Sequence, residues 1–570
     1  MIACEEKTPP SPTFDPQEQA PLGRALNRAG TACAAAKANG AEVLPAVRQK
    51  AELQEVEQQL ATDPEAISLR LRRARLLSQL GRQAEAKDEY LKVLESEPNH
   101  LGALNNLGNV WFLMGQCQEA RNAYREAILR HPDVPNSRVN LANLLLQESE
   151  LLEARGCGQE ARHAKQEARE HYEYALVLKP EYQPAHQGLS FLLGSLGEEQ
   201  QAAWHRREAF RNRYIVPFPY RGDHAPVPVL LLSSTSGGNV SLHKFLDDRI
   251  FQTYIVMPEF YDRHKPLPAH ELVVNAIGDT EMAPGALAAA QSFLTLTSAP
   301  VINSPAAVFA TGRSNNAKRL SSLPGVATPT TVTLARDQLT GANAPATLAG
   351  YGLEFPVLLR VPGFHTGMKF LRVENIEALP AALAELPGRE TIVIQYLDAR
   401  GPDGKARKYR VMMIDGQIYP LHLAISNHWK VHYFTAEMAA SPEYRAEEAA
   451  FLEDMPAVLG PQAMHALEQI QSTLGLDYGG IDFVLNAKGE VLVFEANATM
   501  VANPPEAGEQ WSYRLPAYKR IEAAIQKMFR RRIRQDEAQF AGPQPPCESL
   551  FDPTASEAAR KPACSLESSL

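Results

Sequence analysis

The first half of the chain places apolar and small residues at helical spacing between polar ones, with little Gly or Pro. The pattern repeats every 34 residues, so that Ala74 corresponds to Gly108, Gly81 to Gly115, Ala86 to Ala120, Tyr90 to Tyr124 and Pro98 to Pro132. Small residues at these places allow two antiparallel helices to approach, and the proline ends the second helix. The pattern therefore predicts a stack of helical hairpins.

Two further units follow. The third begins near Pro135 and is longer by about 14 residues, because Ala168 follows Ala120 by 48 positions rather than 34. The fourth runs from Gln183 to Ala209, and "AELQEVEQQLATDP" is expected to cap the array at its other end. The units resemble the tetratricopeptide repeat. Such arrays expose a concave surface, so we expect a bound peptide or protein partner or a homo-oligomer, with a passive spacer as the alternative.

The character of the chain changes at "PFPYRGDHAPVPV", Pro217 to Val229. Downstream, short β-branched runs alternate with helical stretches and turn residues, which predicts a mixed α/β half.

One hairpin in that half carries candidate chemistry. "GGIDFVLNAKGEVLVFEANATM" predicts two strands joined by a two-residue turn at Lys488 and Gly489. Symmetric pairing about this turn places Asp482 opposite Glu495, with Cβ atoms about 5 Å apart, and Asn497 on the same face. Opposed carboxylates repel, and a divalent cation reverses that cost. Oxygen-only ligands favour Mg²⁺ or Mn²⁺; the alternative is a hairpin end with two solvated acids.

These strands resemble the metal-binding strands of the ATP-grasp superfamily, particularly its D-alanine–D-alanine ligase, glutathione synthetase and ribosomal-protein glutamate ligase branches. The resemblance extends over about Val227 to Met528. It implies an α-solenoid of repeats followed by an α/β ATP-grasp fold. The expected segments are a disordered tail and lead-in at 1–45, repeats at 46–215, a first α/β subdomain at 225–325, a central nucleotide-binding subdomain at 326–400, a C-terminal subdomain with the metal site at 401–535 and a second disordered tail at 536–570.

The same resemblance implies roles for individual residues. It gives the metal to Asp482, Glu495 and Asn497. Nucleotide contacts fall on Arg313 (with Lys318 as a competing choice), on Arg360, on Gly363 and Gly367 of the loop "PGFHTGMKF", on the backbone of Gln395, Tyr396 and Leu397, and on Asp398 for the ribose. Two features depart from the family: Arg360 stands where Lys is usual, and the loop contains few glycines.

The acceptor side is expected around "LHLAISNHWKVHYFTAEM". Arg410 and Lys430 are candidates for stabilising a developing acyl phosphate. The alternatives are a solvated loop and a zinc site on His422, His428 and His432. Gly480 stands where relatives often have Arg. "SGGN", Ser236 to Asn239, is expected either at a helix N-terminus or in a simple turn.

Composition narrows the class of protein. A net charge of −9 and a pI near 6.0 favour neither nucleic acid nor an anionic membrane as partner. Six cysteines without a CxxC pair, the lack of a signal-peptide pattern and the short apolar runs lead us to expect a cytoplasmic protein.

Together these features predict an ATP- and Mg²⁺-dependent ligase that joins a small-molecule or peptide carboxylate to an amine through an acyl phosphate. The rivals are a non-catalytic nucleotide-binding scaffold or sensor, and an ATP-grasp kinase that phosphorylates a hydroxyl group.

Overall fold

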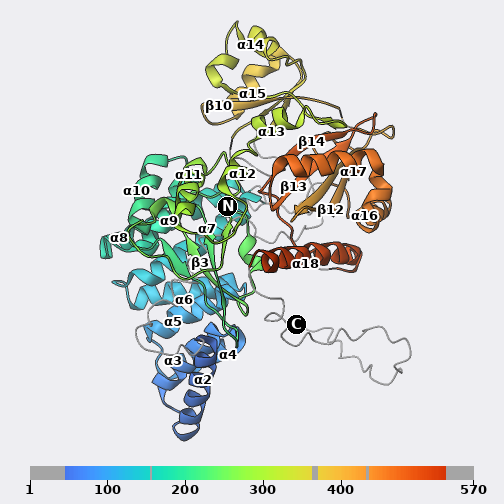
Figure 1. Ribbon diagram of the computed structural model, residues 1–570. Coiled ribbons are helices and arrows are strands. Elements are labelled where there is room, and N and C mark those ends of the chain that lie inside the picture. The colour runs from blue at the N-terminus through green and yellow to red at the C-terminus, as the bar shows by residue number, and fades with distance from the viewer. Residues whose placement is uncertain are drawn as a thin grey trace, which may run out of the picture.

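The structure is a computed structural model, and it describes residues 45–154, 157–362, 370–398, 400–431, 436–506 and 508–533. A column of helices forms one side of the molecule together with the sheet that contains β3, and two further sheets with their helices lie apart from the column (Figure 1). The expected tails and the loop glycines Gly363 and Gly367 lie outside the described residues.

The N-terminal half is a run of antiparallel helices that pack in consecutive pairs. Their bounds are α2 (Pro45–Thr62), α3 (Ile67–Gln79), α4 (Gln83–Ser96), α5 (Leu101–Leu113), α6 (Cys117–Arg130), α7 (Pro135–Ala154), α8 (Gly158–Leu178), α9 (Gln183–Ser195) and α10 (Glu199–Phe210). The four predicted hairpins are α3/α4, α5/α6, α7/α8 and α9/α10, and α2 covers α3 as the expected cap.

Small residues have the predicted effect on helix packing. A Cβ atom on Gly108 would lie 2.5 Å from the Tyr124 ring, so only glycine admits this tyrosine between α5 and α6. Gly81, Gly115 and Gly197 end the first helix of their repeats with φ values of 82°, 78° and 79°, the left-handed conformation that glycine adopts without strain.

The 14 extra residues of the third repeat lengthen both of its helices. α7 and α8 contain 20 and 21 residues, against 13 and 14 in α5 and α6. Each helix gains seven residues, close to two turns, so the apolar faces of the hairpin stay aligned.

The α/β half begins with sheet A, whose strand order is β1-β3-β2-β4-β5. β2 (Val227–Leu232), β3 (Phe251–Val256), β4 (Leu272–Asn275) and β5 (Val301–Ile302) are parallel, and β1 (Ile215–Pro217) is antiparallel at the edge. α11 (Pro284–Phe293), α12 (Pro305–Phe309) and α13 (Arg313–Leu320) follow. β1 lies before the expected start of this half at 225, because three residues are too few to stand out as a strand in the sequence.

Sheet D is antiparallel and forms a separate lobe with α14 (Ala344–Gly350) and α15 (Leu379–Glu385), at the top of Figure 1. Its order is β7-β10-β8-β9, with β7 (Thr331–Ala335), β10 (Glu390–Gln395), β8 (Val357–Arg360) and β9 (Phe370–Val373). Its apolar core is distinct from those of the other sheets.

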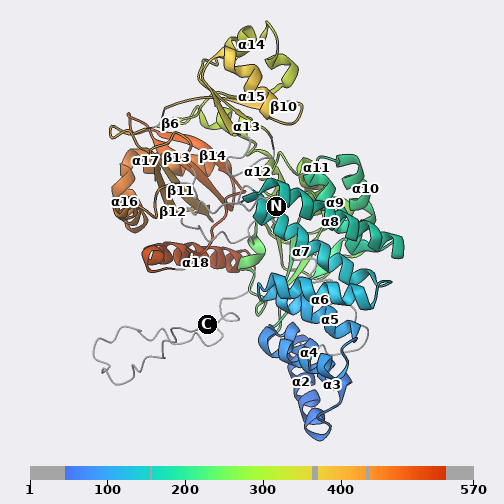
Figure 2. The same cartoon turned by 180° about the vertical axis from the view of Figure 1, so that it is seen from behind.

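Sheet C contains the predicted hairpin. Its order is β12-β11-β13-β14-β6, with β12 (Gln417–Ser426), β11 (Ala406–Ile414), β13 (Tyr478–Leu485), β14 (Val491–Asn497) and β6 (Val326–Ala327). α16 (Pro442–Glu453) and α17 (Met455–Leu474) cover one face. α18 (Leu515–Arg532) joins the other face to sheet A, as seen from both sides in Figures 1 and 2.

The helical array is attached to sheet A through its last helix. Ala209 and Phe210 of α10 share an apolar cluster with β2 and β3, and the ring of Phe210 stacks on Phe260 with centroids 5.6 Å apart. Among the described residues, no helix is both long enough and apolar enough to cross a membrane.

Candidate functional site

A row of ionisable side chains crosses sheet C on one face. Directly opposed residues are His422 and Arg410, Arg410 and Asp482, and Asp482 and Glu495. Opposed residues in a sheet point to the same side. Four neighbouring strands therefore bring a histidine, an arginine and two carboxylates into one line.

The predicted pairing of Asp482 with Glu495 is confirmed, but the predicted turn is wrong. The loop has three residues, closed by hydrogen bonds between Asn486 and Glu490, and Gly489 has φ of 75°. Phe494 is the extra residue of a β-bulge, which shifts the register between Asp482 and Phe483. The three-residue turn shifts the pairing of the two strands by one residue, and the extra residue in the bulge shifts it back. Asp482 therefore still pairs with Glu495.

Asp482 is buried and held by two cations. Arg410 donates from Nε and Nη2 to its two carboxylate oxygens at 2.6 and 2.9 Å, and Lys408 Nζ lies 3.0 Å from Oδ2. Burial alone would raise the pKa of Asp482, but the charges of Arg410 and Lys408 outweigh it and hold the pKa well below its usual range. The carboxylate is therefore ionised and stays so in acid.

His422 ends the row in the neutral state. Burial lowers its pKa well below the usual value, and the charge of Arg410 lowers it further. The cations at this end of the row are therefore Lys408 and Arg410, and His422 adds no further positive charge.

Glu495 meets a third cation, Arg313, which comes from the first turn of α13. Arg313 Nη2 donates to Glu495 at 2.6 Å, and Nη1 donates to Glu281 at 2.5 Å. Burial would lower the pKa of Arg313, but the charges of Glu495 and Glu281 raise it above the usual value. Arg313 is thus a permanent cation bridging the loop after β4 and the end of β14.

Asn497 lies beside Glu495, but its amide oxygen points elsewhere. Nδ2 donates to Glu495 Oε1 at 3.0 Å. Oδ1 accepts from the backbone N–H of Thr499 at 2.9 Å and from its hydroxyl at 2.7 Å. The oxygen expected to bind a metal is engaged in a turn in this conformation.

Gly480 leaves no room for a side chain. A Cβ atom there would lie 2.8 Å from the Val411 carbonyl oxygen and 3.0 Å from Met500 Cβ. A larger side chain such as arginine therefore cannot be accommodated at this position. The cation beside Asp482 comes instead from the adjacent strand, as Arg410.

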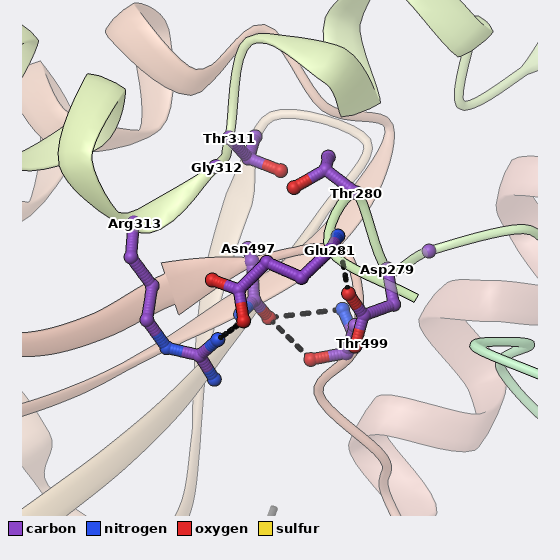
Figure 3. Close-up of a pocket in the computed structure, with 9 residues that line it drawn as sticks. Asp279, Thr280, Glu281, Thr311, Gly312, Arg313, Asn497 and Thr499 are labelled. Atoms are coloured by element: carbon purple, nitrogen blue, oxygen red, sulfur yellow. Dashed lines mark hydrogen bonds and ion pairs between the residues drawn. The ribbon is translucent and has the colours of Figure 1, made fainter. Parts of the chain in front are cut away.

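Two cavities meet at this end of sheet C. The larger lies between α13, β14 and β10 and is lined by Arg313, Asn316, Ala317, Leu320, Thr328, Pro329, Thr331, Ile394 and Val493 to Asn497; we call it the cleft. The smaller, shown in Figure 3, is lined by Gly278 to Glu281, Thr311 to Arg313, Asn497 and Thr499; we call it the side cavity. Arg313 and Asn497 line both.

The expected nucleotide contacts are distributed unevenly around the cleft. Arg313 lines it, whereas Lys318 is exposed and is not among its lining residues. Arg360 is close enough to Arg313 for electrostatic influence: burial lowers the pKa of Arg360, and the charge of Arg313 lowers it further. The structure thus brings Arg313 and Arg360 near each other and leaves Lys318 apart from them.

Several expected hinge groups are engaged within the protein. The backbone N–H groups of Gln395 and Tyr396 donate to the carbonyl oxygens of Thr330 and Pro356 at 2.9 and 3.3 Å. Leu397 is exposed. Asp398 accepts from Arg400 through both carboxylate oxygens, so a ribose would have to compete with that arginine.

Lys430 lies at the edge of sheet D. Its Nζ is 3.5 Å from the Phe370 carbonyl oxygen, and burial lowers its pKa, with a further contribution from Arg360. Its neighbour Trp429 contacts the rings of Phe370 and Tyr396, with centroids 5.7 and 6.1 Å apart. The loop that follows β12 therefore contacts the lobe that contains β9 through Trp429, while Asn427, His428 and Lys430 are exposed, as in the alternative of a solvated loop.

The structure does not support two other expectations, the helix N-terminus at "SGGN" and the three-histidine zinc site, within the residues that it describes. "SGGN" does not begin an α-helix: a bridge from Asn239 to Ile277 and a short 3₁₀ turn at Leu242–Phe245 follow it. Within the described part of the chain, no three His, Cys, Asp or Glu residues could together hold a metal ion. His432 of the zinc alternative lies outside it.

Sequence reasoning missed Lys408 and Glu281. Lys408 is two positions from Arg410 on a strand, a spacing that puts both on one face. Glu281 follows a buried parallel strand at its carboxyl end, where ligand sites of α/β sheets usually lie. Both signals were present in the sequence.

Comparisons with known proteins identify the helical repeats. The tetratricopeptide repeat family matches residues 67–100, which are α3, α4 and the turn that follows. No curated protein matches the chain.

Three solved structures illustrate the similarities in shape. MamA (residues 41 to the end) from Desulfovibrio magneticus RS-1 is 19% identical over 28% of this chain and 84% of its own, with a TM-score of 0.24. TTC0263, a thermophilic TPR protein of Thermus thermophilus, is 22% identical over 25% and 73%, with 0.24. The VanG D-Ala:D-Ser ligase of Enterococcus faecalis is 13% identical over 54% and 100%, with 0.35. These TM-scores are too low to carry an argument about the fold or the site. The chain's own geometry shows a tetratricopeptide-type helical array followed by mixed sheets.

Proposed function

We propose that this chain is an ATP- and Mg²⁺-dependent carboxylate–amine ligase of the ATP-grasp type, whose repeats recruit a peptide or protein partner. The observation that carries the proposal is the row of Arg410, Asp482 and Glu495 on sheet C, which meets Arg313 where the cleft opens between sheets C and D.

The cleft has the composition that a nucleotide needs. Leu320, Ile394 and Val493 give it apolar walls, and Arg313 gives it a cation at one end. An apolar slot suits a base, and guanidinium groups bind phosphate oxygens in pairs. We assign the phosphates to Arg313 and Arg360.

The donor set fits magnesium. Asp482, Glu495 and Asn497 offer only oxygen ligands, and the opposed carboxylates already attract three cationic side chains. Magnesium held by these three residues would neutralise phosphate charge during transfer. Asn497 would first have to release Thr499, and Asp482 would have to share its oxygens with Arg410 and Lys408.

The remaining groups suit acyl transfer. An oxygen of the substrate carboxylate attacks the γ-phosphorus of ATP, and ADP leaves. The amine nitrogen then attacks the acyl carbon, phosphate leaves, and the nitrogen loses a proton. We assign to Arg410 and Lys430 the stabilisation of the negative charge that develops on the acyl phosphate, as fixed cations provide in preorganised sites.

The repeats support partner recruitment through their position. Helical repeat arrays offer extended concave surfaces, and α10 packs directly into the core of sheet A through Phe210. A peptide bound along the array is thereby held close to the α/β half.

One observation favours a second function, a nucleotide-binding scaffold without turnover. Both oxygens of Asp482 and the amide oxygen of Asn497 are engaged by partners within the chain. A cleft whose metal ligands stay engaged would bind nucleotide without transferring phosphate.

Turnover separates these functions. The purified full-length chain is incubated with ATP, Mg²⁺ and a mixture of amino acids and dipeptides, and ADP and phosphate are both measured. The ligase releases ADP and phosphate in equal amounts. A kinase releases ADP while the phosphate stays on an organic product, and a scaffold binds ATP without forming ADP. The absence of ATP binding at millimolar concentration would reject all three.

A further inference from the structure

The side cavity shares Arg313 with the cleft: Glu281, which accepts from Nη1 of Arg313, lines the side cavity, and Glu495, which accepts from Nη2, lines the cleft. The walls of the side cavity come from the loop after β4, from the segment that leads into α13 and from the end of β14. The loop after β4 is at the carboxyl end of a parallel strand, where α/β sheets usually bind ligands. One guanidinium group thus binds an acid of each cavity.

Close packing of two loops shapes this cavity. A Cβ atom on Gly278 would lie 2.6 Å from Val240 Cγ2 and 3.2 Å from the Ala498 carbonyl oxygen. Asp279 fixes the loop, because its Oδ1 accepts from the backbone N–H groups of Glu281 and Met282 at 2.7 and 3.1 Å. The loop therefore presents Glu281 from a defined backbone.

Glu281 is the acceptor at the centre of the cavity. Its side chain reaches across to Arg313, and the hydroxyl groups of Thr280 and Thr311, which also line the cavity, point toward each other (Figure 3). Thr311 donates its hydroxyl proton to the Val308 carbonyl oxygen at 2.7 Å, so the lone pairs of its oxygen can accept.

The charge of the lining favours a cationic ligand. It contains two carboxylates, Asp279 and Glu281, and one cation, Arg313, which is shared with Glu495. A ligand carboxylate would face both acids at short range. The guanidinium of Arg313, 2.5 Å from Glu281, shows that this carboxylate already accepts a charged N–H donor.

We propose that the side cavity binds the ammonium group of a primary alkylamine, with Glu281 as its counter-ion. As the acceptor site of the reaction, this inference rests on the proposed ligase function. An ammonium group has three donors, which Glu281, Thr280 and Thr311 can accept. When the ammonium group binds Glu281, Nη1 of Arg313 is released toward the cleft. Amine binding in the side cavity and phosphate binding in the cleft then both depend on Arg313.

Ligand-observed NMR tests the binding step on the full-length chain without ATP. The probes are methylammonium, ethylammonium and 1,4-diaminobutane, each compared with methanol, ethanol or 1,4-butanediol at equal ionic strength. We expect saturation transfer to the amines and not to the alcohols. The saturation-transfer signal of the amines should be at least about fivefold lower with the Glu281→Gln variant than with the wild type. The Thr280→Val variant should lower the same signal by a smaller factor.

The control is Glu85→Gln, which removes the acid of an exposed Arg–Glu pair on α4 and should bind amines as the wild type does. Circular dichroism verifies the fold of each variant, and Thr280→Val keeps the test valid if Glu281→Gln unfolds. Equal binding by wild type and both cavity variants, or equal binding of alcohols, would overturn the assignment.

ATP binding measured on the same samples separates this inference from the proposed function. Amine binding that depends on Glu281, without ATP binding, would reject the ligase and retain the cavity. ATP binding without any amine binding would reject the cavity assignment alone.

Discussion

The guanidinium of Arg410 binds both oxygens of Asp482, its directly opposed neighbour across β11 and β13, at 2.6 and 2.9 Å. The pair lies in the same row as Glu495, so the expected metal ligands are neutralised by side chains of the chain itself. This relationship connects the stability of sheet C to the chemistry of the cleft.

Removing Arg410 should destabilise the α/β half. Arg410→Met leaves the buried Asp482 with Lys408 as its remaining cation, and breaking a buried pair from one side costs about 3 kcal/mol. We expect a lower midpoint in thermal unfolding of the full chain, with the transition of the helical array unchanged.

The double variant Arg410→Met/Asp482→Asn gives the control, because it removes the buried charge as well. Its cost should be smaller than the sum of the two single costs. Additive costs would mean that the two side chains do not interact in solution.

Gly480 should tolerate no side chain. Gly480→Ala places a methyl group 2.8 Å from the Val411 carbonyl oxygen, and overpacking of this kind costs about 1–3 kcal/mol. Gly285→Ala is the matched control, since a Cβ atom there meets nothing within 4 Å in the first turn of α11. Urea unfolding measures both, and equal stability of the two variants would contradict the packing.

Arg313 rather than Lys318 should bind phosphate. Arg313→Met should weaken ATP binding at least tenfold, or about 1.4 kcal/mol, because it removes the cation that lines the cleft. Lys318→Met should change the affinity by less than about twofold, since Lys318 is exposed on the same helix. Calorimetric titration with ATP and Mg²⁺ measures both, and the reverse order would return the role to Lys318.

The pairing of Asp482 with Glu495 could be predicted from the sequence, but the route to it could not. Asn486 Oδ1 accepts from the backbone N–H groups of Lys488 and Glu490 at 2.9 and 3.0 Å, which favours the three-residue turn. Nothing in the sequence indicates that Phe494 bulges out to restore the register, because a bulge depends on packing against the neighbouring strands.

The partners of the site residues were harder to predict, since they come from separate elements. Glu281 meets Arg313 from another loop, and Lys408 meets Asp482 from another strand. The engagement of Asn497 is local. Asn often accepts from the backbone two residues ahead, so the sequence Asn-Ala-Thr at 497–499 could have indicated it.

The last repeat should lose stability in mild acid. Burial lowers the pKa of His205 to about 4, and the charge of neighbouring His186 adds to the effect. An unfolded histidine titrates near pH 6.5. The unfolded state therefore binds the proton more tightly, and the contribution of His205 is present above about pH 6.5 and is lost as the pH falls toward 4.

Thermal unfolding of the helical array between pH 8 and pH 4.5 measures this loss. The variant His205→Gln should flatten the dependence between pH 6.5 and pH 4.5. His163→Gln, at an exposed position of α8, should leave it as in the wild type. A steep dependence that persists in His205→Gln would place the responsible group elsewhere.

The most direct test of the ligase uses substrates whose carboxyl groups carry ¹⁸O. The full-length chain is given ATP, Mg²⁺ and a mixture of such labelled amino acids and dipeptides, and the released phosphate is analysed by mass spectrometry. An acyl phosphate transfers one carboxyl oxygen to each phosphate. We therefore predict that the released phosphate contains one ¹⁸O and that the Asp482→Asn/Glu495→Gln variant does not form this labelled phosphate. ADP release accompanied by unlabelled phosphate would contradict the account.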